Sequence, residues 1–130
     1  MPFILQVDHE SGKARATATG VVTLEEIRSH LDEEFRRSGL AYRELIDATG
    51  ATLAISAQEA WNVVELLRSY GRTGALGPTA VIVADELSYG MCRMIGILLD
   101  DVCELRPFRA SDRAAAEQWL AAAPVAPAQA

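Results

Sequence analysis

The chain has 130 residues, of which 50% are hydrophobic, 23% are charged and 6% are aromatic. This length and composition fit one ordinary soluble domain, and they exclude an intrinsically disordered chain. Eighteen acidic residues against twelve basic residues give a net charge of -6, which argues against a protein that neutralises the phosphate backbone of nucleic acid.

Targeting signals and cysteine usage indicate a cytoplasmic protein. The N-terminal residues lack a basic segment followed by a long apolar run, so no secretory signal peptide is predicted. The longest apolar runs are far shorter than the roughly 20 residues that span a bilayer. The two cysteines, Cys92 and Cys103, lie in apolar stretches and form no C-x-x-C pair, which predicts two buried thiols.

The first 40 residues predict a β-hairpin followed by a helix. Residues 3–7 and 13–21 flank the turn-prone Glu10-Ser11-Gly12, and alanines alternate with polar residues in the second run. The capping box Thr23-Leu24-Glu25-Glu26 then begins a helix that ends at Gly39. The predicted core side of this helix consists of Leu24, Ile27, Leu31 and Phe35. His30 falls outside that side, and Asp32, Glu33 and Glu34 are expected on a solvated face.

The remainder of the chain predicts alternating strands and helices. Residues 42–47 read as a strand, and a second capping box at Ser56 begins an amphipathic helix that ends near Gly71. The continuous apolar run at residues 79–84 is typical of a central parallel strand. Residues 86–100, 102–108 and 111–121 then predict a helix, a strand and a last helix.

The resulting order, ββαβαβαβα, predicts one α/β domain over residues 1–121. We expect a five-stranded mixed sheet with an N-terminal β-hairpin and four helices. Residues 122–130, rich in Ala and Pro, are expected to form a disordered tail.

The third predicted helix carries an unusual surface. Its expected core face is Leu87, Met91, Met94, Ile95 and Leu98, and the opposite face is Tyr89, Gly90, Arg93, Gly96 and Ile97. Small residues beside Tyr and Arg favour close approach of a partner. We therefore expect a homodimer or a protein partner on helix 86–100. The alternative is that the last helix, with Trp119, covers this face within the monomer.

The sequence offers little catalytic chemistry. Asp8-His9-Glu10 contains three metal-capable side chains, but consecutive extended residues point to opposite sides, so a solvated turn is the better interpretation. There is no G-x-S-x-G elbow, and no motif brings a histidine to a serine. We predict neither an enzyme nor a bound metal or cofactor.

Candidate binding residues gather at one edge of the predicted sheet. Ligands of open α/β sheets lie outside the carboxyl ends of the parallel strands. Low-specificity candidates at this edge and on the third helix are Asp47, Thr49, Ser56, Asp85, Tyr89, Arg93 and Arg109. Each has an ordinary structural alternative, such as helix capping by Ser56 and Asp85.

Several segments together resemble the bacterial SpoIIAA-like family, also described as STAS/CRAL-TRIO-like, over about residues 3–120. They are Thr19-Gly20-Val21-Val22-Thr23-x-Glu25-Glu26, Leu45-Ile46-Asp47-Ala48, the run at 79–84, Tyr89-Gly90-x-x-Arg93-Met94 and Phe108-Arg109-x5-Ala115-x3-Trp119-Leu120. The resemblance implies a STAS-type sheet-and-helix domain, similar to anti-sigma-factor antagonists and to lipid-carrier domains of the same topology. Antagonists carry an Asp-Ser-Ser-Gly-like segment whose serine is phosphorylated. Here the stretch is Ala54-Ile55-Ser56-Ala57, without the acid or the glycine.

Two functions from different classes remain open. The first is a non-enzymatic regulatory or protein-interaction module of the STAS/SpoIIAA-like type. The alternative is a carrier of a small apolar or anionic, lipid-like ligand held between the helices and the sheet. Nucleic acid is not an expected partner of either.

Overall fold

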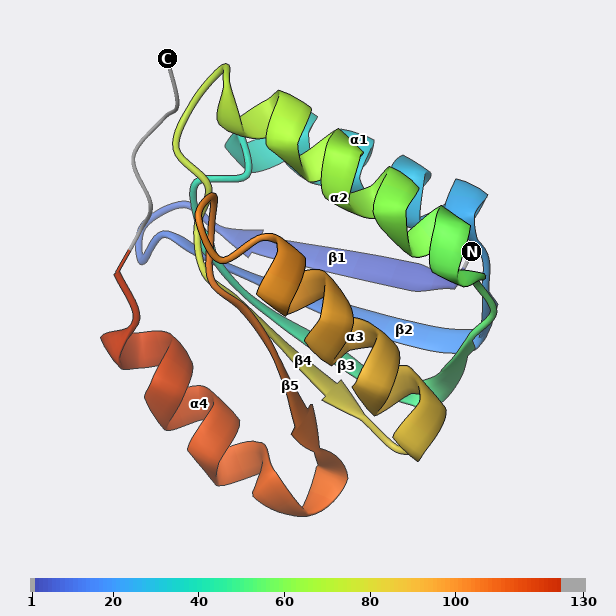
Figure 1. The fold of residues 1–130 in the computed structure, drawn as a ribbon. Helices are drawn as coiled ribbons and strands as arrows, with labels where there is room; N and C mark the ends of the chain where they lie inside the picture. Colours follow the sequence, from blue (N-terminus) through green and yellow to red (C-terminus); the bar gives the residue numbers. More distant parts are fainter. Residues whose placement is uncertain (1, 125–130) are drawn as a thin grey trace.

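The computed structural model describes residues 2–124 of the chain, which form one sheet with helices on both faces (Figure 1). The strands are β1 (Phe3–Asp8), β2 (Lys13–Val22), β3 (Arg43–Leu53), β4 (Thr79–Val83) and β5 (Leu105–Arg109). The helices are α1 (Leu24–Ser38), α2 (Ala57–Gly71), α3 (Glu86–Leu98) and α4 (Arg113–Ala122), with a short 3-10 turn, η1 (Ala110–Asp112), before the last. The strand order is β1-β2-β3-β4-β5.

The pairing of the strands confirms the predicted mixed sheet. β1 and β2 form the expected antiparallel hairpin, and the pairs β2–β3, β3–β4 and β4–β5 are parallel. Ala14, Ala16 and Ala18 are buried on one face of β2, as their alternation indicates. β4 is an interior strand whose last four residues are buried, although β3 holds the middle position in the sheet.

The third strand is longer than residues 42–47. Beyond a register shift between Thr17 and Thr19, β2 pairs with β3 again until Val22 lies opposite Leu53. Polar and small residues in the second half of β3 interrupt the hydrophobic alternation by which a strand is recognised, so the sequence conceals this extension.

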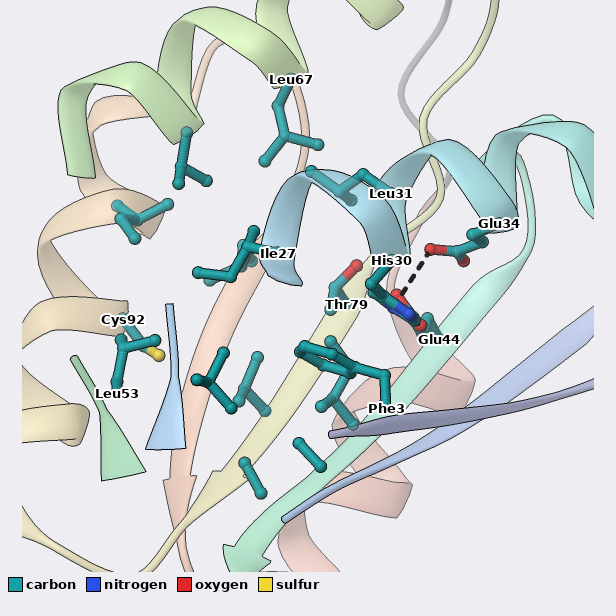
Figure 2. A pocket seen from close by; sticks show the side chains of 18 of the residues that line it. Phe3, Ile27, His30, Leu31, Glu34, Glu44, Leu53, Leu67, Thr79 and Cys92 are labelled. Atoms are coloured by element: carbon teal, nitrogen blue, oxygen red, sulfur yellow. Dashed lines mark hydrogen bonds and ion pairs between the residues drawn. The ribbon is translucent and has the colours of Figure 1, made fainter. Parts of the chain in front are cut away.

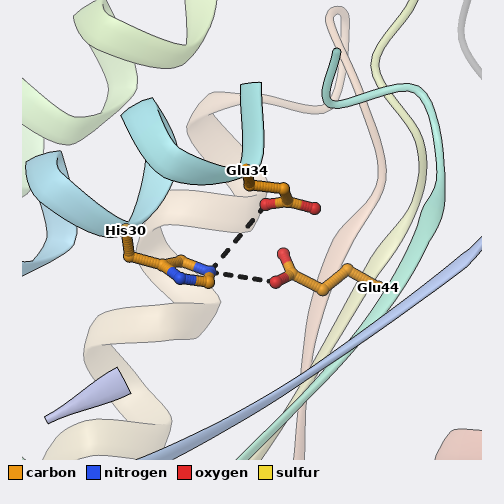
Figure 3. A group of neighbouring side chains, drawn as sticks. All are labelled: His30, Glu34 and Glu44. Atoms are coloured by element: carbon orange, nitrogen blue, oxygen red, sulfur yellow. Dashed lines mark hydrogen bonds and ion pairs between the residues drawn. The ribbon is translucent and has the colours of Figure 1, made fainter. Parts of the chain in front are cut away.

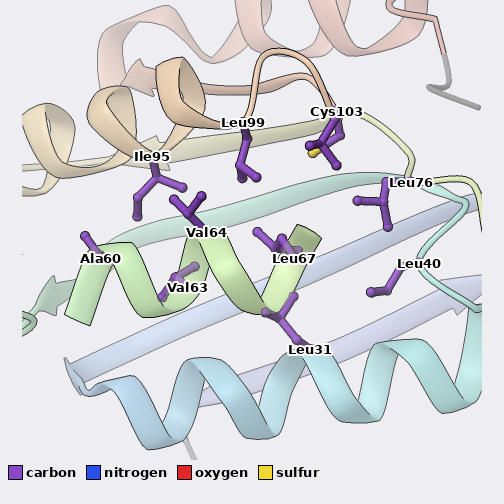
Figure 4. Close-up of a cluster of buried hydrophobic side chains, with 11 residues drawn as sticks. Leu31, Leu40, Ala60, Val63, Val64, Leu67, Leu76, Ile95, Leu99 and Cys103 are labelled. Carbon is purple, nitrogen blue, oxygen red and sulfur yellow. The ribbon is translucent and has the colours of Figure 1, made fainter. Parts of the chain in front are cut away.

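Helices α1, α2 and α3 cover one face of the sheet, and α4 covers the other (Figure 1). Between the first three helices lies a core that includes Leu31 from α1, Val64 and Leu67 from α2, and Ile95 and Leu99 at α3 (Figure 4). On the opposite face, Leu120 of α4 packs against Leu45, Ile82 and Phe108. Among residues 2–124, the helices are too short or too polar to span a lipid bilayer.

The predicted core face of the third helix is correct for Ile95, which is buried, and for Met91, Met94 and Leu98, which pack against the core, but it is wrong for Leu87. Its buried residues are Ser88, Cys92 and Ile95, whereas the side chain of Leu87 is 71% exposed. The reason is the close approach of α3 to β5, because a Cβ atom on Gly96 would lie 2.2 Å from the carbonyl oxygen of Leu105. Gly96 therefore faces the sheet and does not belong to an exposed strip, which rotates the inward side of the helix.

The last helix does not cover α3, so that alternative is also wrong. The ring of Trp119 lies 5.8 Å from the ring of Phe108 on the opposite side of the sheet. The helix reaches Ala122, Ala123 is buried, and Arg43 donates hydrogen bonds to the carbonyl oxygens of Leu120 and Ala123. The first residues assigned to the tail are thus anchored, and residues 125–130 of that prediction lie outside the described residues.

Both cysteines are buried thiols, as predicted. Cys92 and Cys103 are free and buried. Burial raises the pKa of Cys92 to about 12 and that of Cys103 to about 11, so both remain protonated at neutral pH.

Candidate functional site

A cavity of about 130 Å³ lies between the sheet and the three helices α1, α2 and α3 (Figure 2). Most of its wall is apolar, with contributions that include Phe3, Ile27, Leu53, Val63, Leu67 and Leu105. On the sheet side the wall includes Ala18, Ala48 and Ala51. These short side chains fill less of the space beneath the helices than Val or Leu would, which explains why room is left there.

Three titratable side chains break the apolar wall at one corner. They are His30 and Glu34 on α1 and Glu44 on β3, and all three side chains point toward one another (Figure 3). The Nε2 atom of His30 lies 2.9 Å from Oε2 of Glu44 and 3.8 Å from Oε1 of Glu34. Each of the three side chains is no more than 4% exposed. We refer to these three residues as the buried triad.

The helix and the strand bring the triad together by simple periodicity. His30 and Glu34 are one helical turn apart, so they lie on the same side of α1 as Ile27. Glu44 pairs with Ala14 of β2 and Thr79 of β4, and it therefore faces the helices from the interior of the sheet.

Two sequence predictions for α1 are corrected here. His30 and Glu34 were expected on the polar side, yet they are 5% and 2% exposed, while Phe35 of the expected core side is 38% exposed. The helix turns the row of Ile27, His30 and Glu34 inward, and the Phe35 ring lies 4.9 Å from that of Tyr70. A pattern scored only for apolar residues could not find an inward row that includes a histidine and a glutamate.

Burial controls the protonation of the triad. Burial, and after it the charge of Glu44, raise the pKa of Glu34 to about 10. Burial also raises the pKa of Glu44 to about 7, whereas a hydrogen bond from Glu34 acts in the opposite direction. The pKa of His30 is lowered, mainly by burial. At neutral pH the triad therefore holds a protonated Glu34, a neutral His30 and a Glu44 that is partly ionised.

The imidazole of His30 has one nitrogen free for further contact. Phe3 stacks on the ring at 4.3 Å between centroids, and Nε2 contacts Glu44. With a proton on Nε2, that atom donates to the Glu44 carboxylate and Nδ1 becomes an acceptor. Nδ1 is buried without a hydrogen-bond partner among residues 2–124.

None of the seven binding residues predicted at the sheet edge and on the third helix lines the cavity. Asp47 accepts hydrogen bonds from the backbone and hydroxyl of Thr49, and it pairs with Arg113 at 2.7 Å. Ser56 and Asp85 are the N-caps of α2 and α3, the structural alternatives considered above.

The other three predicted residues lie on α3 or beside it. The guanidinium of Arg109 lies 4.0 Å from the centre of the Tyr89 ring and forms an ion pair with Glu86 at 2.9 Å. Arg93 is exposed on the same helix. The structure thus brings Tyr89 and Arg109 together. The Arg109 guanidinium already contacts the Tyr89 ring and the Glu86 carboxylate.

The hairpin turn is as solvated as expected. The Asp8 carboxylate accepts hydrogen bonds from the backbone N–H groups of Glu10 and Ser11. All four of these turn residues, including His9, are exposed. Within the described part of the chain, the group whose donor atoms could converge on a metal ion is the buried triad.

Comparison with solved structures identifies the fold. A crystal structure of an uncharacterised protein of the DUF3478 family from Shewanella loihica PV-4, described as having a SpoIIAA-like fold, is 20% identical to this chain. The likeness covers 91% of each chain with a TM-score of 0.55. No protein-family model matches the chain, and no curated protein matches it. The chain therefore has the SpoIIAA-like fold that the sequence resemblance implied, and this likeness concerns the fold alone.

Proposed function

We propose that the protein binds a small, mostly apolar molecule in the cavity beneath α1, α2 and α3, without catalysing a reaction on it. The observation that carries this proposal is the composition of the cavity wall, which is mostly apolar and has polar side chains at the buried triad and at Tyr42, Thr79 and Ser88. Such a wall holds an apolar body by burial and orients it through a few polar contacts. The partnerless Nδ1 of His30 supplies an acceptor for a hydroxyl or amine of the ligand.

The size of the cavity limits the ligand. A volume of about 130 Å³ is close to that of an engineered protein cavity of about 150 Å³ that binds benzene. A single ring or a short alkyl chain therefore fits the cavity as it stands. A longer lipid-like chain requires the helices to move away from the sheet.

The charge of the triad selects the polar group of the ligand. Two buried carboxyl groups face one imidazole, and the low polarity of the surroundings strengthens any repulsion between like charges. An anionic head group is disfavoured here, so the anionic ligand of the sequence-based alternative is replaced by an uncharged donor or a protonated amine.

A series of ligands that differ only in charge tests this proposal. Benzyl alcohol, benzylamine and benzoate share one ring, and their binding to metal-free protein can be followed by backbone amide chemical shifts. We expect shifts in cavity residues such as Val63 and Cys92 with the alcohol and the amine. Benzoate should bind at least ten times more weakly. Equal binding of all three would contradict the role of the triad, and no binding of any would contradict the proposal.

A matched pair of variants locates the binding. Ala48→Leu fills the cavity from β3, whereas Ala114→Leu adds the same side chain to an exposed position on α4. We expect the first to weaken benzyl alcohol binding by tenfold or more and the second to leave it unchanged. The same loss in both variants would place the ligand elsewhere.

A second candidate function, a regulatory or protein-interaction module, is favoured by the outer surface of α3. Leu87, Gly90 and Ile97 share one helical face because Gly90 follows Leu87 by three residues and Ile97 follows Gly90 by seven. Leu87 is 71% and Ile97 is 60% exposed, and a Cβ on Gly90 would meet open space. We propose that a second copy of the chain pairs with this face.

Light scattering at high micromolar concentration tests the pairing. Leu87→Arg should convert a dimer into a folded monomer, whereas Val21→Arg, at another exposed apolar residue on β2, should leave the dimer intact. A monomeric wild-type protein would overturn this second proposal.

A further inference from the structure

We infer that His30, Glu34 and Glu44 bind a divalent transition-metal cation, with Zn²⁺ as the best match. This site uses the same buried triad that faces the ligand cavity, but it does not require the ligand-binding function proposed above. One imidazole nitrogen and two carboxylates are common zinc ligands, and each of the three residues offers one donor atom within 4.8 Å of the other two. All three residues are buried, which distinguishes this set from an exposed acidic cluster.

The distances within the triad suit a tetrahedral ion. Metal–ligand bonds of 2.0–2.2 Å at tetrahedral angles place neighbouring donor atoms about 3.4 Å apart. The 2.9 Å from His30 Nε2 to Glu44 and the 3.8 Å from His30 Nε2 to Glu34 lie on either side of that separation. Each glutamate has a second oxygen and a freely turning terminal torsion, so small side-chain rotations close the site without backbone movement.

Charge gives a reason for two glutamates to meet in the interior. Two ionised carboxylates without a cation repel each other at this depth, so one must keep a proton. A divalent cation with two carboxylates and a neutral imidazole forms a site of zero net charge.

The donor set also limits the kind of metal and the affinity. Imidazole with carboxylates suits Zn²⁺, Co²⁺, Fe²⁺ and Mn²⁺, whereas Mg²⁺ and Ca²⁺ prefer oxygen alone and Cu⁺ prefers sulfur. Three protein ligands leave the fourth position to the adjoining cavity.

A metal on Nε2 moves the imidazole proton to Nδ1, which lacks a protein acceptor among the described residues. Because such an acceptor is typically worth 10–100-fold in affinity, we expect a dissociation constant of about micromolar order.

Cobalt absorption provides the test. Untagged protein treated with a chelator is titrated with Co²⁺ at pH 8, where competition from protons is weaker. We expect a strong visible absorption band from a tetrahedral Co²⁺ centre, saturating at one ion per chain, and its loss when Zn²⁺ is added. No band at millimolar Co²⁺, together with no heat of Zn²⁺ binding in calorimetry, would overturn the inference.

Two matched pairs of variants assign the ligands. Glu34→Gln should weaken Co²⁺ binding by tenfold or more, whereas Glu33→Gln, at a half-buried residue whose carboxylate pairs with Arg37 outside the triad, should leave it unchanged. His30→Gln and His9→Gln form the second pair, because His9 is exposed on the hairpin. If His30→Gln fails to fold, the glutamate pair decides alone. Binding lost with His9 or Glu33 but kept with Glu34→Gln would place the metal elsewhere and contradict this site. Because the ring-ligand series uses metal-free protein, either proposal can fail without the other.

Discussion

His30 and Glu44 join helix α1 to the interior of the sheet through a contact of 2.9 Å between Nε2 and Oε2. The two residues are buried, and Glu34 completes the group from one turn further along α1. Interior positions of this kind normally carry apolar side chains, because an uncompensated buried charge costs several kcal/mol. The triad therefore lowers the stability of the fold relative to an apolar core, and that loss can be measured.

Stability should fall as pH rises above neutrality. The unfolded chain releases the Glu34 proton near its ordinary pKa of 4.5, whereas the folded chain keeps it until about pH 10. The contribution of this proton is complete below pH 4.5 and declines as pH rises toward the folded pKa. We expect the free energy of unfolding, measured with urea in chelator, to fall by about 1.4 kcal/mol per pH unit between pH 7 and 8.5.

The comparison of wild type with Glu34→Gln isolates this effect. The raised pKa of Glu44, about 7, acts in the same direction at the lower end of the pH window. The lowered pKa of His30 acts in the opposite direction only below its ordinary value of 6.5, and the two thiols act only above about pH 9. Glu34→Gln should flatten the slope, because its amide is neutral at every pH, whereas Glu33→Gln should keep it. Equal slopes in wild type and Glu34→Gln would show that Glu34 is ionised in the folded protein.

Ser56 should act as a helix cap. Its hydroxyl oxygen accepts a hydrogen bond from the backbone N–H of Glu59 at 3.1 Å, and Glu59 accepts one from the backbone N–H of Ser56. Ser56→Ala should cost about 1 kcal/mol of unfolding free energy and Ser56→Asp should be close to neutral. Ser69→Ala, near the end of the same helix, is the control and should change little. A phosphoserine at position 56 that alters a partner in cells would instead assign Ser56 a regulatory role.

The sequence predicts the architecture well because most of its elements follow single strong signals. Capping boxes mark the starts of α1 and α2, and the apolar run of β4 marks an interior strand. The errors arise where tertiary contacts override local pattern. The inward side of α3 depends on how closely Gly96 approaches β5, and the length of β3 depends on its pairing with β2. Neither contact is visible in a local window of sequence.

The candidate site could not be predicted from the sequence for a related reason. His30 and Glu34 occupy inward positions of α1, but a histidine and a glutamate count as polar in any hydrophobic pattern. A usable signal did exist in Glu44, which directly precedes Leu45 and Ile46 in a strand that lies inside the sheet. A charged residue in a strand with both neighbours paired and a helix layer above it is a candidate for function, because it has no solvent to face.

Ile82→Asp should unfold the protein. Ile82 is fully buried on β4 in the cluster that contacts α4. An unpaired carboxylate there costs several kcal/mol against a total stability of about 5 to 15 kcal/mol. Ile4→Asp places the same change at a residue that is 65% exposed, and it should be tolerated. Circular dichroism during thermal unfolding distinguishes the two, and a cooperative transition at unchanged temperature in Ile82→Asp would contradict the burial of this strand.

Two glycines of α3 should respond in opposite directions to the same substitution. A Cβ on Gly90 meets nothing within 4 Å, whereas a Cβ on Gly96 lies 2.2 Å from the carbonyl oxygen of Leu105, a backbone atom that cannot rotate away. Gly90→Ala should stabilise the protein by about 0.5 to 1 kcal/mol, because alanine loses less backbone entropy in a helix. Gly96→Ala should destabilise it by about 1 to 3 kcal/mol, because α3 must move away from β5. Urea unfolding of both variants measures the difference, and each variant serves as the control for helix propensity in the other. A Gly96→Ala variant as stable as Gly90→Ala would mean that α3 does not pack this closely on the sheet, and the inward row of Ser88, Cys92 and Ile95 would then need to be reassigned.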